Sequence, residues 1–303
     1  MRASAFVSGD FRGFYYTAAR ETDRCMIVLL GDDGDDFMSK LCAKWLTRAQ
    51  NCHALCLALR RSRAEDPGIS RWPLEQAAHA VRWLLDRGIS KIGIMGMSMQ
   101  GAMALSAAAR IPEFSLTLAL SPCDFVPWGF CHGRKKEEFP TGASAFSWQG
   151  QDLPFQPPML EPENYWLLYQ TATKAYHEMH SRTLFDLSEE FHPVSTEALI
   201  PVENIPGKLV LVGAEDDSMW DAAKYIRRME VRLGNKTPAP ALEALIYPYG
   251  THLLVPQKML DLSLPPVGNL VSRMFVSGRR YPAACKAARL DLEEKLTAVF
   301  EAW

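Results

Sequence analysis

The most constraining feature of this sequence is the run Lys91-Ile-Gly-Ile-Met-Gly-Met-Ser-Met-Gln-Gly101, followed at once by the small residues 102–109. An apolar run, a glycine-bounded turn and an alanine-rich stretch predict a strand, a sharp turn and a helix, with Ser98 at the apex. Glycine allows backbone segments to approach where a Cβ would clash. Such a turn exposes Ser98 Oγ as a candidate nucleophile and places the Met99 N–H at a helix start, where it can stabilise an oxyanion. The alternative is an ordinary strand-to-helix turn that carries serine incidentally.

Strand and helix patterns alternate along the chain, which is typical of a mostly parallel sheet with helices on both faces. The predicted strands are residues 25–30, 52–59, 91–95, 115–121, 208–213 and 242–247, and the predicted helices are 37–50, 74–87, the segment from the serine turn to about 110, and 282–303. Residues 122–206 break the alternation, are rich in Pro, Trp and Phe, and contain one predicted helix, 164–180. We interpret them as an insertion over the C-terminal edge of the sheet, where open α/β sheets bind ligands, within a single domain spanning residues 1–303.

Composition and charge narrow the class of protein. A net charge of −2 and a pI near 6.4 give no general attraction to nucleic acid or to an anionic membrane. Residues 92–109 are apolar, but three glycines, two serines and a glutamine inside them predict a buried strand-turn-helix unit and not a membrane span. Seven cysteines without paired spacing predict reduced thiols, and no secretory signal is evident at the N-terminus. We therefore expect a cytoplasmic protein with a small-molecule substrate.

Two later segments supply partners for a serine nucleophile. Strand 208–213 runs into an acidic segment that contains Asp216 and Asp217, and strand 242–247 runs into a glycine turn and His252. A serine needs a general base, and the base needs an orienting carboxylate, each on a loop after a later strand. His252 is the predicted base, and either aspartate fits the position of the acid. The order serine, aspartate, histidine is that of α/β hydrolases.

His177 and His180 form the other candidate pair of functional histidines. Their i, i+3 spacing would place them on one side of a helix, but no third ligand accompanies them in the sequence. We interpret the pair as a helix face, and we expect neither a metal nor an organic cofactor.

Four stretches resemble the C-terminal domain shared by acyl-CoA thioesterases and bile acid-CoA:amino acid N-acyltransferases. They are Glu215-Asp-Asp-Ser-Met-Trp220, Gly31-Asp-Asp-Gly-Asp-Asp36, Phe146-Ser-Trp-Gln-Gly-Gln-Asp-Leu-Pro154 and Tyr247-Pro-Tyr-Gly-Thr-His252. The resemblance implies an α/β-hydrolase fold, an acyl thioester substrate, and Asp217 as the acid of the triad. Thr251 departs from the family pattern, which has glycine there.

The loop 31–36 carries aspartates at positions 32, 33, 35 and 36, where the family has more glycine and serine. Carboxylates beside a developing oxyanion would oppose a negative transition state unless they point outward or meet cations. We expect a solvated loop in which the backbone N–H of Asp33 or Gly34 completes an oxyanion hole with Met99. The alternative is a loop that selects against anionic substrates, which would disfavour a CoA ester.

Candidate substrate-binding residues come from two kinds of segment. Arg60 and Arg61, in the run 60–63, and the basic run 134–136 are candidates for the phosphates of CoA, or they are solvated charges. Trp128 and Trp148 of the insertion are candidates for an acyl pocket, or they seat the insertion on the sheet.

The sequence thus predicts a serine hydrolase that cleaves an acyl thioester through an acyl-enzyme. Ser98 attacks the carbonyl, His252 transfers the proton and Asp217 orients the imidazole. Family members that conjugate an acyl group to an amino acid carry cysteine as the nucleophile, so the resemblance disfavours acyl transfer here. The alternatives are a carboxylesterase or small-peptide hydrolase acting on a neutral substrate, and a non-catalytic binding protein of the same fold. The complete Ser98, Asp217 and His252 set argues against the last.

Overall fold

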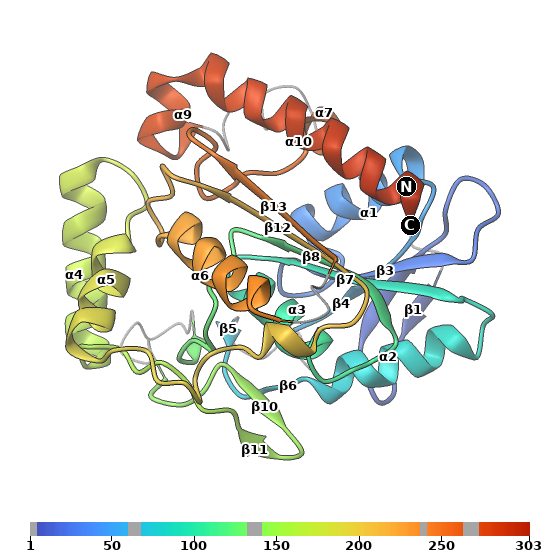
Figure 1. Ribbon diagram of the computed structural model, residues 1–303, viewed down its shortest axis with the longest axis horizontal. Helices are drawn as coiled ribbons and strands as arrows, with labels where there is room; N and C mark the ends of the chain where they lie inside the picture. The colour runs from blue at the N-terminus through green and yellow to red at the C-terminus, as the bar shows by residue number, and fades with distance from the viewer. Residues whose placement is uncertain (1–4, 60–67, 132–140, 237–240, 263–272) are drawn as a thin grey trace.

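An eight-stranded sheet in the order β1-β2-β4-β3-β7-β8-β12-β13 forms the centre of the molecule. The computed structural model describes residues 5–59, 68–131, 141–236, 241–262 and 273–303 (Figure 1). The strands of this sheet are β1 (Ala5–Val7), β2 (Gly13–Tyr16), β3 (Arg24–Leu29), β4 (His53–Leu57), β7 (Lys91–Met97), β8 (Phe114–Leu120), β12 (Lys208–Ala214) and β13 (Ala241–Tyr247). The strands from β4 to β13 pair in parallel, and β1 and β2 add an antiparallel edge. The predicted fold class is confirmed.

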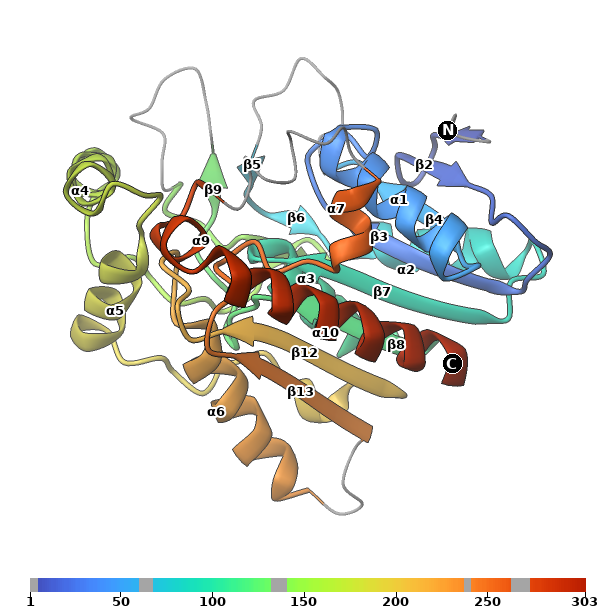
Figure 2. The ribbon, with the colours of Figure 1, turned by 90° about the horizontal axis from the view of Figure 1, so that it is seen from above.

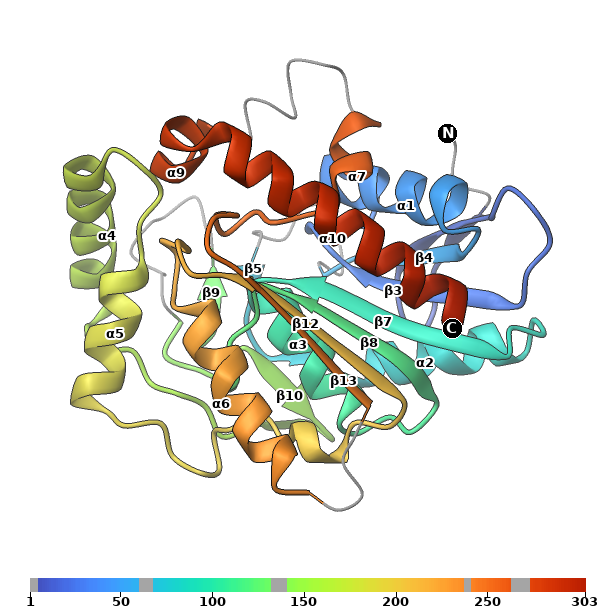
Figure 3. The same cartoon turned by 45° about the horizontal axis from the view of Figure 1, so that its top comes forward.

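Helices cover both faces of this sheet (Figures 1 and 3). One face carries α1 (Phe37–Ala49), α7 (Gln257–Asp261) and α10 (Pro282–Ala302); the other carries α2 (Glu75–Leu85), α3 (Met99–Ala108) and α6 (Ala222–Gly234). Each face has its own buried apolar cluster. Because the central strands are buried on both sides, their sequences are near-continuous apolar runs, as β3 and β12 illustrate.

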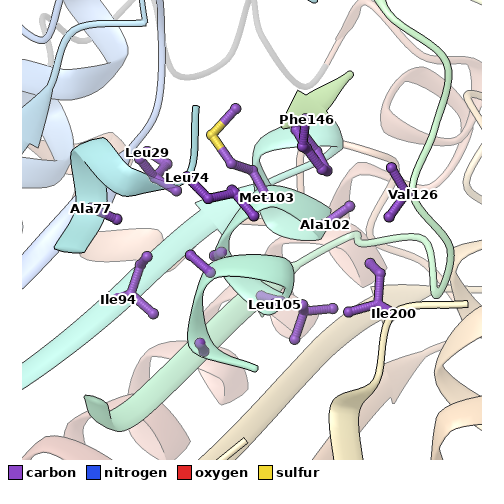
Figure 4. Packing of buried hydrophobic residues seen from close by; sticks show 14 of the residues in the cluster. Leu29, Leu74, Ala77, Ile94, Ala102, Met103, Leu105, Val126, Phe146 and Ile200 are labelled. Atoms are coloured by element: carbon purple, nitrogen blue, oxygen red, sulfur yellow. The ribbon is translucent and has the colours of Figure 1, made fainter. Parts of the chain in front are cut away.

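Helix α3, which follows Ser98, is buried on every side. Figure 4 shows Ala102, Met103 and Leu105 of α3 within one buried apolar cluster, which also contains Leu29 of β3 and Ile94 of β7. All residues from 101 to 108 are buried. A helix without a polar face needs such an enclosed position, and its many alanines let it lie close to the sheet. The element that carries the candidate nucleophile is therefore anchored in the core.

Each of the six predicted strands and the predicted helices 37–50, 74–87 and 282–303 is present, with ends shifted by a few residues. The sequence analysis missed the short strands β1 and β2. The three residues of β1 are exposed or half-buried, and β2 is only four residues long, so neither has the long apolar run that marks the central strands. The predicted helices also do not include α6.

The segment between β8 and β12 forms small elements beside the C-terminal edge of the sheet. They are β9 (Phe130–Cys131), β10 (Phe146–Trp148), β11 (Gln151–Asp152), α4 (Pro162–Tyr176), α5 (Arg182–Phe191) and the 3₁₀ helix η2 (Val202–Asn204). In Figure 2 the arrows of β12 and β13 point toward the end of the molecule where α4, α5 and α9 (Val276–Arg280) lie. We refer to residues 122–206 as the cap.

A second segment, far away in the sequence, joins the cap. Strand β6 (Trp72–Pro73) pairs in parallel with β10, and β5 (Gly68–Ile69) pairs with β9. The exposed Arg71 lies between β5 and β6, and its Nε lies 2.9 Å from Asp152 Oδ1 in β11. The connection between β4 and α2 thus supports the cap.

Candidate active site

Ser98 occupies a sharp turn between β7 and α3. Its φ of 62° and ψ of −133° lie in a region that residues other than glycine rarely adopt. The glycines on either side allow the turn, because a Cβ on Gly96 would lie 2.0 Å from Gln100 O and one on Gly101 would lie 3.2 Å from Leu120 O. Ser98 N–H donates to the Leu120 carbonyl at 2.9 Å. Met99 begins α3, where the first N–H groups have no intrahelical acceptor.

Asp217 and His252 form a buried pair at the ends of β12 and β13. His252 Nδ1 lies 2.8 Å from Asp217 Oδ2 and 3.0 Å from Oδ1, and the two residues are 5% and 1% exposed. Asp217 Oδ1 also accepts the Met219 N–H at 2.8 Å and the Trp220 N–H at 3.3 Å. These bonds orient the carboxylate toward one ring nitrogen and leave Nε2 as the nitrogen available for proton transfer.

Neighbouring groups contact His252 at its ring and at its backbone carbonyl. The Trp220 ring meets the His252 ring edge to face, with centroids 5.3 Å apart and planes at 86°. Trp220 Nε1–H donates to the Ser121 carbonyl at 3.0 Å, and the Ser121 hydroxyl donates to the His252 carbonyl at 2.9 Å. Ser121 directly follows β8, and Asp217 and Trp220 follow β12. Residues after two neighbouring strands thus position the histidine that follows β13.

Asp216 makes a different set of contacts from Asp217. Its Oδ1 accepts the Gly250 and Thr251 N–H groups, each at 2.9 Å, just before His252. Burial raises the pKa of Asp216, and these backbone hydrogen bonds oppose that shift. Of the two acids, Asp217 bonds the imidazole and Asp216 bonds the backbone before it.

A cavity of about 380 Å³ opens beside Ser98. It is lined mainly by aromatic rings and methionines from the cap and the acid turn; the lining residues are Gly31, Asp32, Gly68, Ile69, Ser98, Met99, Gln100, Pro127, Trp128, Phe130, Tyr165, Trp166, Tyr169, Met179, Ser181, Phe185, Met219 and Trp220. Asp32 is the only charged residue among the described residues of this lining. Such a surface suits an apolar, uncharged group.

The cavity wall continues to His252 through a chain of aromatic rings. Trp128 stacks on Phe185, with ring centroids 4.7 Å apart, and meets Tyr165 edge to face. Phe185 meets Trp220 edge to face at 5.0 Å, and Trp220 contacts His252. Trp128 therefore lines the cavity. Trp148 does not belong to the lining; it packs, partly buried, against the main apolar cluster.

The aspartate-rich loop is arranged differently from the sequence-based expectation. Gly31 and Asp32 line the cavity, whereas the expected oxyanion donors Asp33 and Gly34 do not. Asp33 N–H faces Asp36 Oδ2 at 3.4 Å, and a Cβ on Gly34 would lie 2.6 Å from the Cys56 carbonyl. The cause of the difference is that the loop turns back onto β4 after two residues.

Asp35 and Asp36 have structural partners in the first turn of α1. Asp36 caps α1 by accepting the Ser39 N–H at 3.0 Å, and Asp35 pairs with Lys40 at 3.7 Å. The carbonyl of Gly31 accepts from the Gln100 side chain at 2.8 Å, which ties the loop to the first turn of α3. Asp32 is the carboxylate of this loop that borders the cavity.

Several candidates lie elsewhere. Arg60, Arg61 and the basic run 134–136 are outside the described residues. Helix α4 ends at Tyr176, so His177 is its left-handed cap, and His180 stacks on Tyr176 with its Nε2 2.9 Å from Thr183 Oγ1. Across the described ranges, no group of three His, Cys, Asp or Glu residues is placed to hold a metal. In those same ranges no helix has the length and apolar character to span a membrane.

Sequence reasoning missed the residues that support the pair. Ser121 and Trp220 were not recognised as contacts of His252, although Trp220 lies three residues after Asp217. Arg182, at the start of α5, donates from Nη1 to the carbonyls of Glu215 and Asp217, both at 3.1 Å. Nothing local in the sequence signals a bond between positions 35 residues apart.

The strand order, the serine turn and the loops that carry aspartate and histidine define an α/β-hydrolase fold. The solved structure of a Pyrococcus furiosus esterase shares the fold, with a TM-score of 0.50 at 15% identity over 87% of this chain and 86% of that one. A putative esterase from Staphylococcus aureus aligns with a TM-score of 0.49 at 10% identity over 95% of this chain and 83% of its own. A Pyrococcus horikoshii acylaminoacyl peptidase aligns with a TM-score of 0.49 at 14% identity, over 83% of this chain and 37% of its own.

Family membership follows from the sequence match. Residues 73–259, more than half of the chain, match the model of the family described as BAAT / Acyl-CoA thioester hydrolase C terminal. The protein therefore belongs to this family. No curated protein matches the sequence significantly.

Proposed function

We propose that this protein is a serine hydrolase that cleaves an acyl thioester through a Ser98–His252–Asp217 triad. The observation that carries the proposal is the buried His252–Asp217 pair, which lies beside a cavity lined by Ser98. Family membership supports a thioester as the substrate.

The reaction would proceed in two halves. Ser98 Oγ attacks the thioester carbonyl while His252 Nε2 accepts its proton, and the oxyanion lies between the Met99 N–H and the Gly31–Asp32 segment. His252 then protonates the departing thiolate, which leaves an acyl-enzyme. Water attacks the acyl-enzyme with His252 as base, and Ser98 leaves with the returned proton. Asp217 remains ionised throughout and holds the imidazole in one tautomer.

The aromatic cavity would hold the acyl group. Its wall of Trp128, Phe185 and Trp220 offers broad apolar surfaces near the reacting atoms. Rigid aromatic walls bind apolar groups at a low cost in conformational entropy. We therefore expect an uncharged acyl group, with the leaving group outside the cavity.

A carboxylesterase or small-peptide hydrolase acting on a neutral substrate is the second candidate. Asp32 borders the cavity, and a carboxylate there would repel an anionic leaving group. The same triad would act on a neutral ester without change.

Paired substrates separate the two candidates. The purified protein is assayed with an acyl-CoA and with the p-nitrophenyl ester of the same acyl chain, at low and at high salt, with Ser98→Ala as the control. A thioesterase cleaves the acyl-CoA efficiently, and its KM for acyl-CoA rises with salt, because exposed charge pairs are screened over about 8 to 10 Å. Efficient cleavage of the ester with poor cleavage of acyl-CoA at both salt concentrations would establish the carboxylesterase instead.

A further inference from the structure

The residue before the triad acid has no place in the mechanism above, yet it contacts the loop that carries the triad histidine. Asp216 Oδ1 accepts two consecutive backbone N–H groups, those of Gly250 and Thr251, at 2.9 Å each. Asp216 follows β12 and this loop follows β13, so the carboxylate links the ends of two neighbouring parallel strands.

The loop needs such support because its backbone is strained at the position before His252. Thr251 has a φ of 64°, in the left-handed region that β-branched residues strongly disfavour. It is also buried. A strained residue of this kind persists only where its surroundings hold it in place. The two bonds from Asp216 are the polar contacts that hold the N–H side of this turn.

His252 is thereby fixed in the main chain on both sides of its own Cα. Asp216 holds the N–H of the preceding residue, and the Ser121 hydroxyl donates to the His252 carbonyl at 2.9 Å. The side chain of His252 then has only its own torsions with which to meet Asp217, 2.8 Å away. Small displacements at such a position are costly, because an error of about 1 Å in a reacting group lowers rates by around 10²-fold.

We propose that Asp216 is a positioning residue that clamps the Gly250–Thr251 turn and so aims His252 at Asp217 and Ser98. This inference rests on the proposed triad. The two consecutive aspartates thus have separate tasks: Asp217 bonds the imidazole and Asp216 bonds the backbone that carries it. The property that the clamp needs is an oxygen acceptor, and its negative charge is dispensable.

The test compares variants that differ in that property. Asn at position 216 keeps an amide oxygen that can accept both N–H bonds, whereas Ala and the similarly shaped Leu keep no acceptor. Activity is measured on a p-nitrophenyl ester, together with the labelling rate by a fluorophosphonate probe and the melting temperature. We expect Asp216→Ala to lower kcat by about 10- to 100-fold with little change in KM, because the residue lies off the cavity wall. Asp216→Asn should retain most of the activity.

Asp216→Leu covers the case in which Asp216→Ala does not fold, because it fills the same space without an acceptor. Equal activity in the Asn, Ala and Leu variants would overturn the clamp, as would an equal loss in all three, which would point to the charge. The controls Ser98→Ala and Asp217→Asn distinguish this failure from that of the triad. If both controls are inactive and Asp216→Leu is fully active, only the clamp is wrong; if Ser98→Ala remains active, both proposals fall.

The backbone conformation offers an independent measurement. Glycine adopts a positive φ without strain, so Thr251→Gly should make the turn depend less on its clamp. In a double-mutant cycle, the loss of kcat caused by Asp216→Leu should be several-fold smaller in the Thr251→Gly background than in the wild type. Equal losses in the two backgrounds would contradict the proposal.

Discussion

Ser98 and His252 are positioned by backbone turns with a positive φ, at Ser98 itself and at the residue before His252. Ser98 takes a positive φ inside a turn that two glycines make possible, and the helix behind it is buried. His252 follows a positive φ at Thr251, a β-branched residue, and hydrogen bonds from the Gly250 and Thr251 N–H groups to Asp216 hold that turn. Both arrangements fix a side chain of the proposed triad, the nucleophile before a buried helix and the base on a hydrogen-bonded loop.

The first prediction concerns the nucleophile. Ser98→Ala should abolish covalent labelling by a fluorophosphonate probe and lower ester turnover by several orders of magnitude, because no other group replaces the attacking oxygen. Gel fluorescence after labelling and steady-state assays are the measurements. Ser106→Ala is the matched control, since Ser106 lies in the same helix with its side chain buried away from the cavity. Labelling that persists in Ser98→Ala would remove Ser98 from the mechanism.

The second prediction concerns the paired acids. Asp217→Asn should lower kcat on the order of 10⁴-fold, because asparagine does not hold the catalytic tautomer of the imidazole. Asp216→Asn should have a small effect, since its amide oxygen still accepts both backbone N–H groups. Steady-state kinetics of the two variants on one ester are sufficient. The reverse order would show that the acid of the triad is Asp216.

At the scale of elements, the start of α5 and the turn after β12 form one bonded unit. Arg182 Nη1 bonds the carbonyls of Glu215 and Asp217, and Arg182 also pairs with Asp221. The N–H groups of Ser181 and Arg182 donate to the Ser218 carbonyl at 3.1 and 3.0 Å. The cap thus contacts the turn that carries Asp217, the proposed acid of the triad.

The third prediction tests this unit. Arg182→Ala should lower the free energy of unfolding by about 1 to 3 kcal/mol, because it leaves partly buried carbonyls without a donor. It should also lower kcat, because the turn that orients Asp217 loses a support. Denaturant unfolding and ester kinetics are the measurements. The control is Lys208→Ala, which breaks a partly exposed pair with Glu243 at 2.7 Å and should cost about 1 kcal/mol or less. Equal effects of the two changes would contradict the role of Arg182.

The fourth prediction concerns the aromatic wall of the cavity. Trp128→Phe removes part of a buried ring that faces the cavity, so kcat/KM for longer acyl chains should rise relative to shorter ones. A series of p-nitrophenyl esters of increasing chain length measures this preference. Trp148→Phe is the control, because Trp148 packs in the cap without lining the cavity. An unchanged preference in Trp128→Phe would mean that the acyl group lies elsewhere.

At the scale of the whole molecule, parallel strands bring distant positions to one edge. Gly31, Ser98, Ser121, Asp217 and His252 follow β3, β7, β8, β12 and β13, which are consecutive neighbours in the sheet. Parallel pairing places the carboxyl ends of all five strands on the same side. The site is therefore a property of the sheet order, although each of its residues lies on a separate loop.

The fifth prediction concerns the cysteines enclosed by this sheet. Six cysteines are buried and free, and burial raises the pKa of their thiols, to about 12 for Cys52; they are Cys25, Cys42, Cys52, Cys56, Cys123 and Cys285. Since the thiolate is the reactive form, these thiols should be inert at neutral pH. Titration with a disulfide reagent should find at most one fast thiol in the native protein, and all seven in denaturant. Two or more fast thiols in the native state would contradict the buried placement.

The sequence by itself determined the main strands and helices of the sheet, and the order in which Ser98, the two acids and His252 follow those strands. Apolar runs mark the central parallel strands from β4 to β12 because buried parallel strands have no polar face, and the glycines mark the serine turn because only they allow such close backbone contacts. The position of His252 after a strand also follows from local pattern. The choice of Asp217 over Asp216 came from a family resemblance, since both positions satisfy the local pattern equally.

The tertiary structure alone decided which groups meet. It turned Gly31 and Asp32, in place of Asp33 and Gly34, toward the cavity, and it brought β5 and β6 to the cap. It also joined Asp216 to Thr251 and Arg182 to the carbonyl of Asp217. These contacts depend on strand register and on the path of loops between distant residues. Local periodicity carries no information about them, because it records only which face of each element is buried.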